Sequence, residues 1–484
     1  MNTAVDIARY GARIVVVGVA DIHPPRNEMW HKELEIIVSK AGGPGTFDPL
    51  YENKGLDYPV GYVRWTVNRN LEEFFRLMSE GKVDVKPLIS HRFKIDQAEN
   101  VYKDIIDKKG GPYIGVVLEH PEEPQDTEHK RRNISERKIV LKPPSQKASA
   151  VSVGVIGAGL FGKAILLSIL KKIPGINLDT IATSSSANTY HVARKYGFEK
   201  CTTDYKEIFS NNNINSIIIL TPHSLHAKMV IEAINAGKHV FVEKPLCIDE
   251  KELNQIMKAY LEIQNSSSSM PLLVVGYNRR FSPHTSRIDE YLSNRQGPMV
   301  INYRINPGFL PTDHWVHSEQ EGGSRVIGEM CHFVDFMQFL THSNPIRIFA
   351  ERVLGNNRTI LNSDNVVITL KFGDGSVGNI VYSASGDKVF SREQIEVFCE
   401  GSVIVSKDFR QTLFYKEGKC KSFKTTNQQL GYREELCHFF DVIVGNSASK
   451  LSLGEIYYST LAVLGINEAL DKGQVVELKG KGVI

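Results

Sequence analysis

A chain of 484 residues exceeds the usual size of a single domain, so its length predicts about three domains. A formal net charge of only +3 excludes a strongly basic surface for nucleic acid or for an anionic membrane. Six cysteines are scattered without a C-x-x-C pair, and no apolar run approaches the roughly 20 residues of a membrane-spanning helix. These features predict a cytoplasmic protein with reduced thiols and no metal site.

Residues 1–120 predict a partial α/β segment. Residues 13–20, RIVVVGVA, form an apolar strand pattern, and residues 71–85 and 93–109 have the helical period. Residues 121–150 are charged, polar and dotted with proline, which predicts a linker, although KIVL within them could form a short strand.

Residues 151–280 alternate apolar strands with amphipathic helices, a pattern typical of a parallel sheet covered on both faces. Gly157, Gly159 and Gly162 form G-x-G-x-x-G between the first strand and its helix. The first glycine permits a tight turn, the second lets the backbone approach a pyrophosphate, and the third lets helix and strand pack closely. We therefore predict a Rossmann-type doubly wound domain. Its expected cofactor loop is Gly157, Gly159, Leu160, Phe161 and Gly162.

The end of the second strand leaves the cofactor's phosphate undecided. An acidic residue is expected there, roughly 20 positions after the glycine motif, to bind the ribose of NAD. The strand ends instead in Thr183 and Ser184, whose hydroxyl groups could meet either a ribose hydroxyl or a 2′-phosphate. Both residues are expected to contact the cofactor, which is NAD or NADP.

Residues 281–484 predict a second, α+β domain for substrate binding and oligomerisation. Several strand-like runs separated by turns favour a mostly antiparallel open sheet, interrupted by one helix over residues 328–342. A last helix over residues 453–473 ends at a glycine and could pack back on the Rossmann domain.

Three further segments follow the glycine motif in order: TPHSLH (221–226), EKP (243–245) and GGSRVIGEMCHFVD (322–335). Together they resemble the Gfo/Idh/MocA family of oxidoreductases over about residues 150–484. The resemblance implies an NAD(P)-dependent oxidoreductase that acts on a CH–OH group of a sugar, a polyol or a nucleotide-sugar. It also implies that the strand ends beside the nicotinamide carry Thr221, Pro222, His226, Glu243 and Lys244.

The same resemblance implies that Lys244 and His332 are catalytic. Oxidation of an alcohol requires a group that accepts the hydroxyl proton as hydride leaves for the nicotinamide. A lysine near the cationic ring would have a lowered pKa, and a histidine titrates in the right range without such help. One position departs from the family: Gly328 stands where an aspartate is common, and Glu329 could replace it only if the helix were rotated or distorted.

The expected substrate side comprises Arg279, His314, Trp315 and His332. Arg279 resembles the family's substrate-side strand end, where an arginine can hold a phosphate or a carboxylate, although a surface ion pair is an alternative. His314 and Trp315 lie on a loop before the GG motif, and an aromatic face with polar neighbours suits a sugar ring. Simple packing of the tryptophan is the alternative.

Residues 11–120 resemble a different family, the C-terminal part of a medium-chain, alcohol-dehydrogenase-like reductase, as found in bi-domain oxidoreductases. No second glycine motif is present and no cysteine precedes Cys201, so we expect this segment to bind neither a dinucleotide nor zinc. It is expected to be a docking or oligomerisation module, or part of an enzyme completed by a partner chain, because an incomplete sheet exposes an edge.

Two alternative functions remain open. Some relatives use NAD transiently and act as glycoside hydrolases by oxidation and elimination. A non-catalytic dinucleotide-binding assembly partner is the other alternative, favoured by Gly328 and by the truncated front segment. The expected partners are a sugar-like small molecule and, in an oligomer, further copies of the chain, with neither nucleic acid nor membrane.

Overall fold

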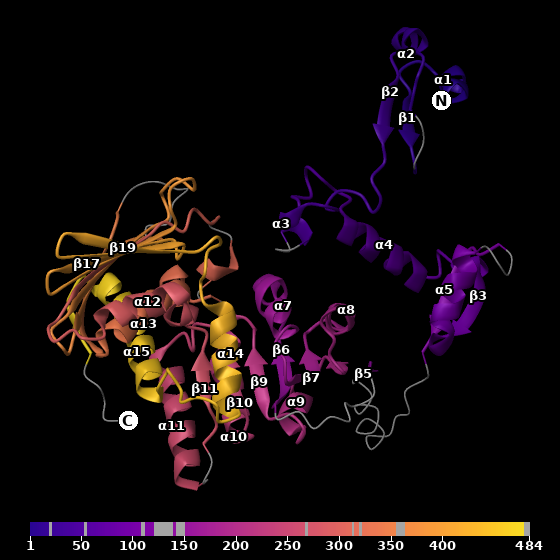
Figure 1. Ribbon diagram of the computed structural model, residues 1–484. Coiled ribbons are helices and arrows are strands. Elements are labelled where there is room, and N and C mark those ends of the chain that lie inside the picture. Colours follow the sequence, from indigo (N-terminus) through magenta and orange to yellow (C-terminus); the bar gives the residue numbers. More distant parts are fainter. Residues whose placement is uncertain are drawn as a thin grey trace. The chain divides into compact units, whose positions relative to one another are not determined.

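The structure is a computed structural model that forms two compact units, Met1–Thr127 and Glu128–Ile484 (Figure 1). Each unit is described by itself. The described residues are 1–18, 22–52, 56–107, 112–120, 139–141, 151–266, 270–311, 314–318, 322–354 and 364–478. Within them no helix is both long enough and apolar enough to cross a bilayer.

The first unit contains two parallel strand pairs, each with a helix between its strands. One pair is β1 (Arg13–Val16) with β2 (Glu35–Val38), and the other is β3 (Ile89–Lys94) with β4 (Gly115–Glu119). The helices are α1 (Asn2–Ile7), α2 (Arg26–Lys32), α3 (Pro49–Glu52), α4 (Val67–Ser79) and α5 (Ala98–Ile106). The helix expected over 93–109 is shorter than predicted because its first residues belong to β3.

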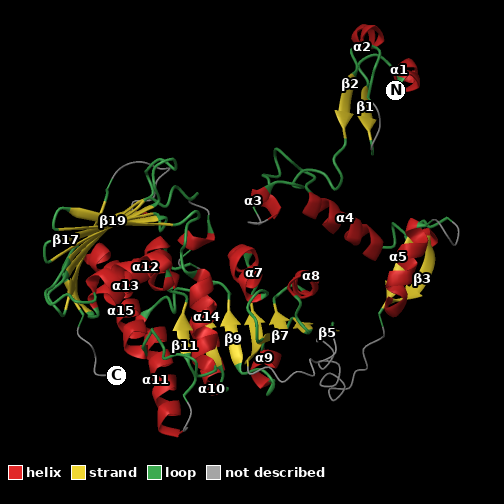
Figure 2. Ribbon diagram, viewed as in Figure 1, coloured by secondary structure: helices red, strands yellow, loops and turns green. Residues whose placement is uncertain are grey.

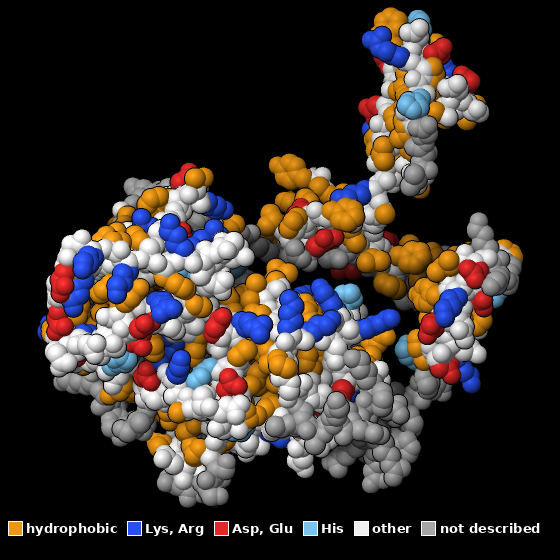
Figure 3. All heavy atoms as spheres, in the orientation of Figure 1, with side chains coloured by type: hydrophobic (Ala, Val, Ile, Leu, Met, Phe, Trp, Pro, Cys, Tyr) orange, Lys and Arg blue, Asp and Glu red, His pale blue; other side chains and the backbone are white. Residues whose placement is uncertain are grey.

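This unit buries little apolar surface. Its described buried hydrophobic side chains are Val5, Val16, Tyr51 and Val101. Large apolar side chains remain exposed on several of its elements, and they are conspicuous over α4 and around β1 and β2 (Figure 3). Such a small core can offset little of the conformational entropy lost on folding.

The second unit begins with the Rossmann sheet. Its strands are β5 (Ile139–Val140), β6 (Val151–Ile156), β7 (Ile176–Ala182), β8 (Lys200–Thr202), β9 (Ser216–Ile219), β10 (His239–Val242) and β11 (Leu273–Val275). They lie in the order β11-β10-β9-β6-β7-β8-β5, and all pairings are parallel except that of β5 with β8. The strand order reverses at β6, and this switch point opens a crevice at the carboxyl ends of the strands.

Helices cover both faces of this sheet (Figure 2). They are the π-helical turn Gly162–Leu166, α7 (Leu167–Leu170), α8 (Ser186–Tyr196), α9 (Lys206–Ser210), the turn His223–Leu225, α10 (His226–Asn235), α11 (Glu250–Ser266) and the turn Asn278–Phe281. Because both faces are covered, every residue of β6 and β9 is buried, which explains their nearly continuous apolar sequences.

The remaining residues build a nine-stranded sheet with helices on one face (Figure 2). Its strands are β12 (Val300–Ile305), β13 (Pro345–Arg352), β14 (Asn365–Phe372), β15 (Val377–Ser383), β16 (Glu393–Cys399), β17 (Ser402–Lys407), β18 (Gln411–Lys416), β19 (Lys419–Lys424) and β20 (Val476–Glu477). Their order is β19-β18-β17-β16-β12-β15-β14-β13-β20, with only β12 and β15 parallel among the described pairs. The predicted fold class, a Rossmann domain followed by a mostly antiparallel α+β domain, is confirmed.

The helices of this part join it to the Rossmann sheet. They are α12 (Pro283–Leu292), α13 (Arg325–Thr341), α14 (Tyr432–Ile443) and α15 (Leu453–Lys472). The last helix, α15, packs on α13 and β13 and also contacts α11 and β11 of the Rossmann domain. The hydroxyl groups of Tyr277 and Thr460 lie 3.4 Å apart across this contact.

Candidate active site

The glycine loop after β6 has a backbone that requires its glycines. Gly157 has φ +93°, and a Cβ there would lie 2.5 Å from the carbonyl oxygen of Leu220 at the end of β9. A Cβ on Gly162 would lie 3.1 Å from the Leu220 side chain. A Cβ on Gly159 would meet nothing within 4 Å, so the loop is open at the point where a pyrophosphate would approach. The loop therefore fits a dinucleotide.

The two apolar residues of this loop differ in their contacts. Leu160 is 86% exposed, whereas Phe161 packs edge-on against Tyr432 of α14 with ring centroids 5.5 Å apart. The glycine loop therefore packs against α14, which lies far along the chain. No sequence pattern indicates this contact.

At the end of β7 the hydroxyl groups are not equivalent. The Thr183 hydroxyl is held within its own loop, 2.5 Å from the Thr189 hydroxyl and 3.2 Å from the carbonyl oxygen of Ser185. Ser184 is exposed. Asp179 lies earlier in the strand and is paired with Lys200 at 3.1 Å, so it is not available to a ribose.

Lys244 and His332 come together at the carboxyl end of β10. The Lys244 ammonium donates a 2.9 Å hydrogen bond to the carbonyl oxygen of Gly328, one helical turn before His332 on α13. His332 is only 6% exposed, and its Nδ1 has no hydrogen-bond partner among the described residues. An unpaired buried nitrogen is costly, so Nδ1 of His332 is a candidate to form a hydrogen bond with a ligand.

The imidazole of His332 is neutral in this state. Burial, together with the positive charges of Arg279, Lys244 and Arg392, holds the pKa of His332 well below its usual value. This contradicts the expectation from the sequence that the histidine titrates near neutrality without help.

The space left by Gly328 is filled by His223. A Cβ on Gly328 would lie 2.9 Å from Cε1 of His223. Nδ1 of His223 donates a 2.9 Å hydrogen bond to the carbonyl oxygen of Gly322, and burial lowers the pKa of this histidine to about 3. No sequence pattern indicated this role of His223, because nothing along the chain links it to Gly328.

Glu329 does not take the place of the family's aspartate. Its carboxylate lies 3.2 Å from Arg325 and 4.0 Å from Arg392, on another side of α13 from the Gly328 contact. The helix is not rotated to bring this residue to the amine.

The predicted contact of His226 with the cofactor is wrong. The side chain is fully buried, so it cannot contact a cofactor directly. Its ring lies 2.7 Å from the carbonyl oxygen of Pro245 and 2.9 Å from that of Thr221. The ring therefore links the segments that follow β9 and β10. Pro222, in the first of these segments, is exposed.

Glu243 is a buried carboxyl behind Lys244. Its Oε2 accepts the backbone N–H of Lys244 at 3.2 Å, and its oxygens come within 3.2 Å of a Cβ built on Gly276. Burial raises the pKa of Glu243 to about 7, although the neighbouring lysine opposes the shift. Glu435 of α14, also buried and without a partner among the described residues, lies near enough to interact with this carboxyl.

The predicted substrate-binding role of Arg279 is also wrong. Its guanidinium donates two hydrogen bonds, of 2.9 and 2.6 Å, to the carboxylate of Glu393, and both side chains are buried. Burial alone would raise the pKa of Glu393, but Arg279 and the Tyr303 hydroxyl hold it below its usual range. The charge of Arg279 is thus already neutralised. Arg279 and Glu393 form a structural ion pair, and Arg279 is not an anion-binding group.

The loop before the GG motif is only partly described. His314 is half-buried and its Nδ1 accepts the backbone N–H of Val316 at 3.3 Å. Trp315 begins the short turn Trp315–His317, but its side chain lies outside the described residues. Their predicted contact with a sugar ring stays a prediction.

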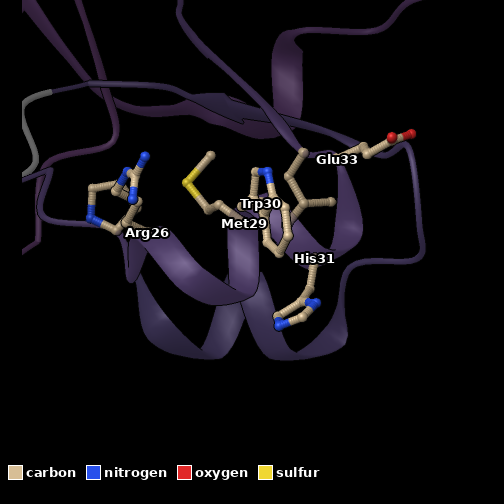
Figure 4. Close-up of a pocket in the computed structure, with 7 residues that line it drawn as sticks. Arg26, Met29, Trp30, His31 and Glu33 are labelled. Atoms are coloured by element: carbon tan, nitrogen blue, oxygen red, sulfur yellow. The ribbon is translucent and has the colours of Figure 1, made fainter.

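Among the described residues no cluster of histidine, cysteine or carboxylate side chains could hold a metal ion. A hollow of about 650 Å³ in the first unit is lined by α2 and its flanking residues, among them Met29 and Trp30 (Figure 4). None of the predicted site residues lies in that unit.

Comparison with known proteins agrees with the fold of the second unit. YrbE, an uncharacterized oxidoreductase of Bacillus subtilis (strain 168), is 26% identical over 309 residues, which cover 61% of this chain and 87% of that protein. The scyllo-inositol 2-dehydrogenase (NAD(+)) of the same organism is 24% identical and covers 60% of this chain and 86% of its own length. A levoglucosan dehydrogenase solved in complex with NADH has a TM-score of 0.59 at 20% identity and covers 68% of this chain and 99% of its own.

Two family matches lie within this unit. Residues 151–266 match the family described as "Oxidoreductase family, NAD-binding Rossmann fold", and residues 298–405 match "GFO/IDH/MocA C-terminal domain". Neither match extends to residues 11–120, whose resemblance to a medium-chain reductase stays a prediction. Residues 151–266 and 298–405 are therefore the Rossmann and C-terminal domains of the Gfo/Idh/MocA oxidoreductase family.

Proposed function

We propose that the chain is an NAD(P)-dependent oxidoreductase that transfers hydride between the nicotinamide and a carbon of a sugar, polyol or nucleotide-sugar. The observation that carries this proposal is the placement of Lys244 on the Gly328 carbonyl, one turn from His332, whose buried Nδ1 has no hydrogen-bond partner among the described residues. Both groups lie at the crevice into which the open glycine loop would direct a dinucleotide. When bound, the nicotinamide supplies the hydride acceptor.

His332 and Lys244 have different roles in the proposed reaction. His332 is neutral, so it can accept the hydrogen of a substrate hydroxyl group. The Lys244 ammonium donates to a carbonyl now and would donate to the substrate oxygen as it gains negative charge. The cations that make His332 a weak base also favour the substrate alkoxide, so the two effects offset each other during proton transfer.

Replacement of Lys244 by methionine tests this role, because methionine keeps much of the side-chain volume and removes the charge. Turnover of NAD⁺ with a panel of polyols and sugars should fall by about 10²- to 10⁴-fold. The affinity for NAD⁺, measured by calorimetry, should stay nearly unchanged. Lys228→Met on α10 is the matched control, since its exposed ammonium makes only a 4.0 Å contact with Glu232. Full turnover by the Lys244 variant would reject the assignment.

A non-catalytic, dinucleotide-binding assembly partner is the second candidate, and one observation favours it. His223 occupies the space beside Gly328, the position at which the family resemblance leads us to expect an aspartate. Tight NAD⁺ binding without turnover over the whole panel would support this candidate against the enzyme. Comparison of NAD⁺ with NADP⁺ affinity settles which cofactor the exposed Ser184 accommodates.

For residues 11–120 we propose the C-terminal part of a medium-chain reductase that serves as a docking or oligomerisation module. Two parallel strand–helix–strand units and a small core support the proposal. The exposed apolar side chains favour association with another chain or another copy. The mass of the full chain in solution, by light scattering, tests association.

A further inference from the structure

A second cavity, of about 430 Å³, lies at one end of the nine-stranded sheet. Its lining includes Asn306, Lys388, Phe390, Arg392, Asp408 and Arg410, and we call it the basic pocket. All of these residues belong to the second unit. A volume of this size is within the range of pockets that bind small ligands.

The basic pocket contains three cationic side chains and one acidic one. The Oδ1 of Asp408 accepts the backbone N–H of Glu393 at 2.7 Å, and its negative charge also acts on Arg304 beside the pocket. Lys388 and Arg410 make no ion pair and no side-chain hydrogen bond with any described residue, and Arg392 reaches its carboxylate neighbours only at 3.8 and 4.0 Å. Like charges in one cavity repel each other, and an anionic ligand relieves that repulsion.

The loop that carries Lys388 and Arg392 is held in place by contacts with β12 and the residue that follows it. Arg304 donates to the carbonyl oxygen and to the hydroxyl of Ser391, at 2.8 and 2.7 Å, and its guanidinium lies 4.4 Å from the centre of the Phe390 ring. Asn306 donates a 2.7 Å hydrogen bond to the carbonyl oxygen of Asp387. A preformed loop loses little entropy on binding. Phe390 is still 60% exposed, so it offers an apolar surface beside the charges.

The basic pocket adjoins the catalytic helix through Arg392. The carbonyl oxygen of Arg392 accepts the backbone N–H of Asn306 at 2.7 Å, inside the pocket lining. Its guanidinium extends to 4.0 Å from Glu329, which precedes His332 by one turn of α13. The positive charge of Arg392 also contributes to the lowered pKa of His332, so the basic pocket and this histidine are neighbours within the second unit.

We propose that the basic pocket binds a phosphate group of the substrate, so that the enzyme acts on a phosphorylated sugar and not on a neutral polyol. The inference rests on the proposed function. Guanidinium groups bind phosphate oxygens through paired, charge-assisted hydrogen bonds, and the lysine adds a point charge. The phosphate comes either from a sugar phosphate or from a sugar nucleotide.

Calorimetry on the full chain saturated with NAD⁺ tests the proposal. Bound NAD⁺ occupies the glycine loop, so the phosphate probes cannot bind there. The probes are pyrophosphate, uridine diphosphate and myo-inositol. Lys388→Gln combined with Arg410→Gln should weaken pyrophosphate binding by about a hundredfold, about tenfold for each cation removed. Lys416→Gln combined with Lys419→Gln is the control, because it removes the same charge from exposed positions at the other end of β18 and β19.

Phosphate binding that the pocket variant weakens and the control variant does not would support the proposal. Equal affinities of pyrophosphate and uridine diphosphate indicate a sugar phosphate, whereas tighter binding of the nucleotide indicates a sugar nucleotide. Binding that is indifferent to the pocket variant, or the absence of phosphate binding while NAD⁺ binds, overturns the pocket assignment. Failure of NAD⁺ itself to bind contradicts the proposed function instead.

Discussion

The close contact between Gly328 and His223 predicts the effect of Gly328→Ala on stability. The substitution should destabilise the protein when His223 is present and stabilise it when His223 is replaced by alanine. A methyl group on Gly328 would lie 2.9 Å from Cε1 of His223, whereas carbon atoms pack best at about 3.5–4.0 Å. The ring would have to move by roughly 0.5–1 Å, and its hydrogen bond to Gly322 resists that movement. We expect Gly328→Ala to cost about 1–3 kcal/mol from overpacking, reduced by up to about 1 kcal/mol because alanine favours a helix.

With His223 replaced by alanine, the methyl group has room. Gly328→Ala should then stabilise the protein by up to about 1 kcal/mol, so the coupling between the two positions is about 1–3 kcal/mol. Denaturant midpoints of the full chain with NAD⁺ measure the four variants of the cycle. Gly454→Ala in α15 is the control, because a Cβ there meets only one side-chain atom, at 3.9 Å, and should stabilise both backgrounds alike. The same effect of Gly328→Ala with and without His223 would refute the packing argument.

Three further predictions concern the glycine loop, a buried carboxyl and the first unit. Gly159→Val should abolish NAD⁺ binding, measured by calorimetry, without lowering the unfolding midpoint, whereas Gly157→Ala should lower that midpoint because its Cβ meets the Leu220 carbonyl at 2.5 Å. Glu243 has its folded pKa raised to about 7 by burial, so the folded state holds the extra proton and loses stability as the pH rises from about 4.5 through 7. Glu243→Gln should remove that loss, about 3 kcal/mol, and thermal melts at about pH 5 and pH 8 should show the variant gaining relative to the parent only at the higher pH. Residues 1–120 expressed alone should show no cooperative thermal transition by circular dichroism, and a sharp transition would show that the small core suffices.

The glycine loop could be predicted from the sequence because three glycines at this spacing directly after a strand are a local pattern. The group that crowds Gly157 and Gly162 is Leu220 at the end of β9, which lies far along the chain. The turn at Gly157 and the open side at Gly159 depend on a few consecutive residues and on the strand that precedes them. The alternation of buried strands and amphipathic helices is equally local, so the Rossmann domain was predictable from periodicity alone.

Contacts between distant segments could not be predicted in this way. Arg279 is neutralised by Glu393 on β16, and the gap at Gly328 is filled by His223 from the Rossmann domain. Each pair joins segments that fold side by side but lie far apart in the chain. The helical period expected from residue 93 overlooked β3, because a short strand whose side chains are only alternately half-buried carries a weak signal.

Hydrogen transfer to enzyme-bound NAD⁺ tests the central claim most directly. Polyols, sugars and sugar phosphates deuterated at their carbinol carbons are incubated with the NAD⁺-loaded full chain, and the mass of the reduced nicotinamide is measured. Deuterium should appear in the cofactor with at least one compound of the panel, and Lys244→Met should largely abolish the transfer. A chain that binds NAD⁺ but takes deuterium from no compound, or a lysine variant that transfers it as fast as the parent, would contradict the account.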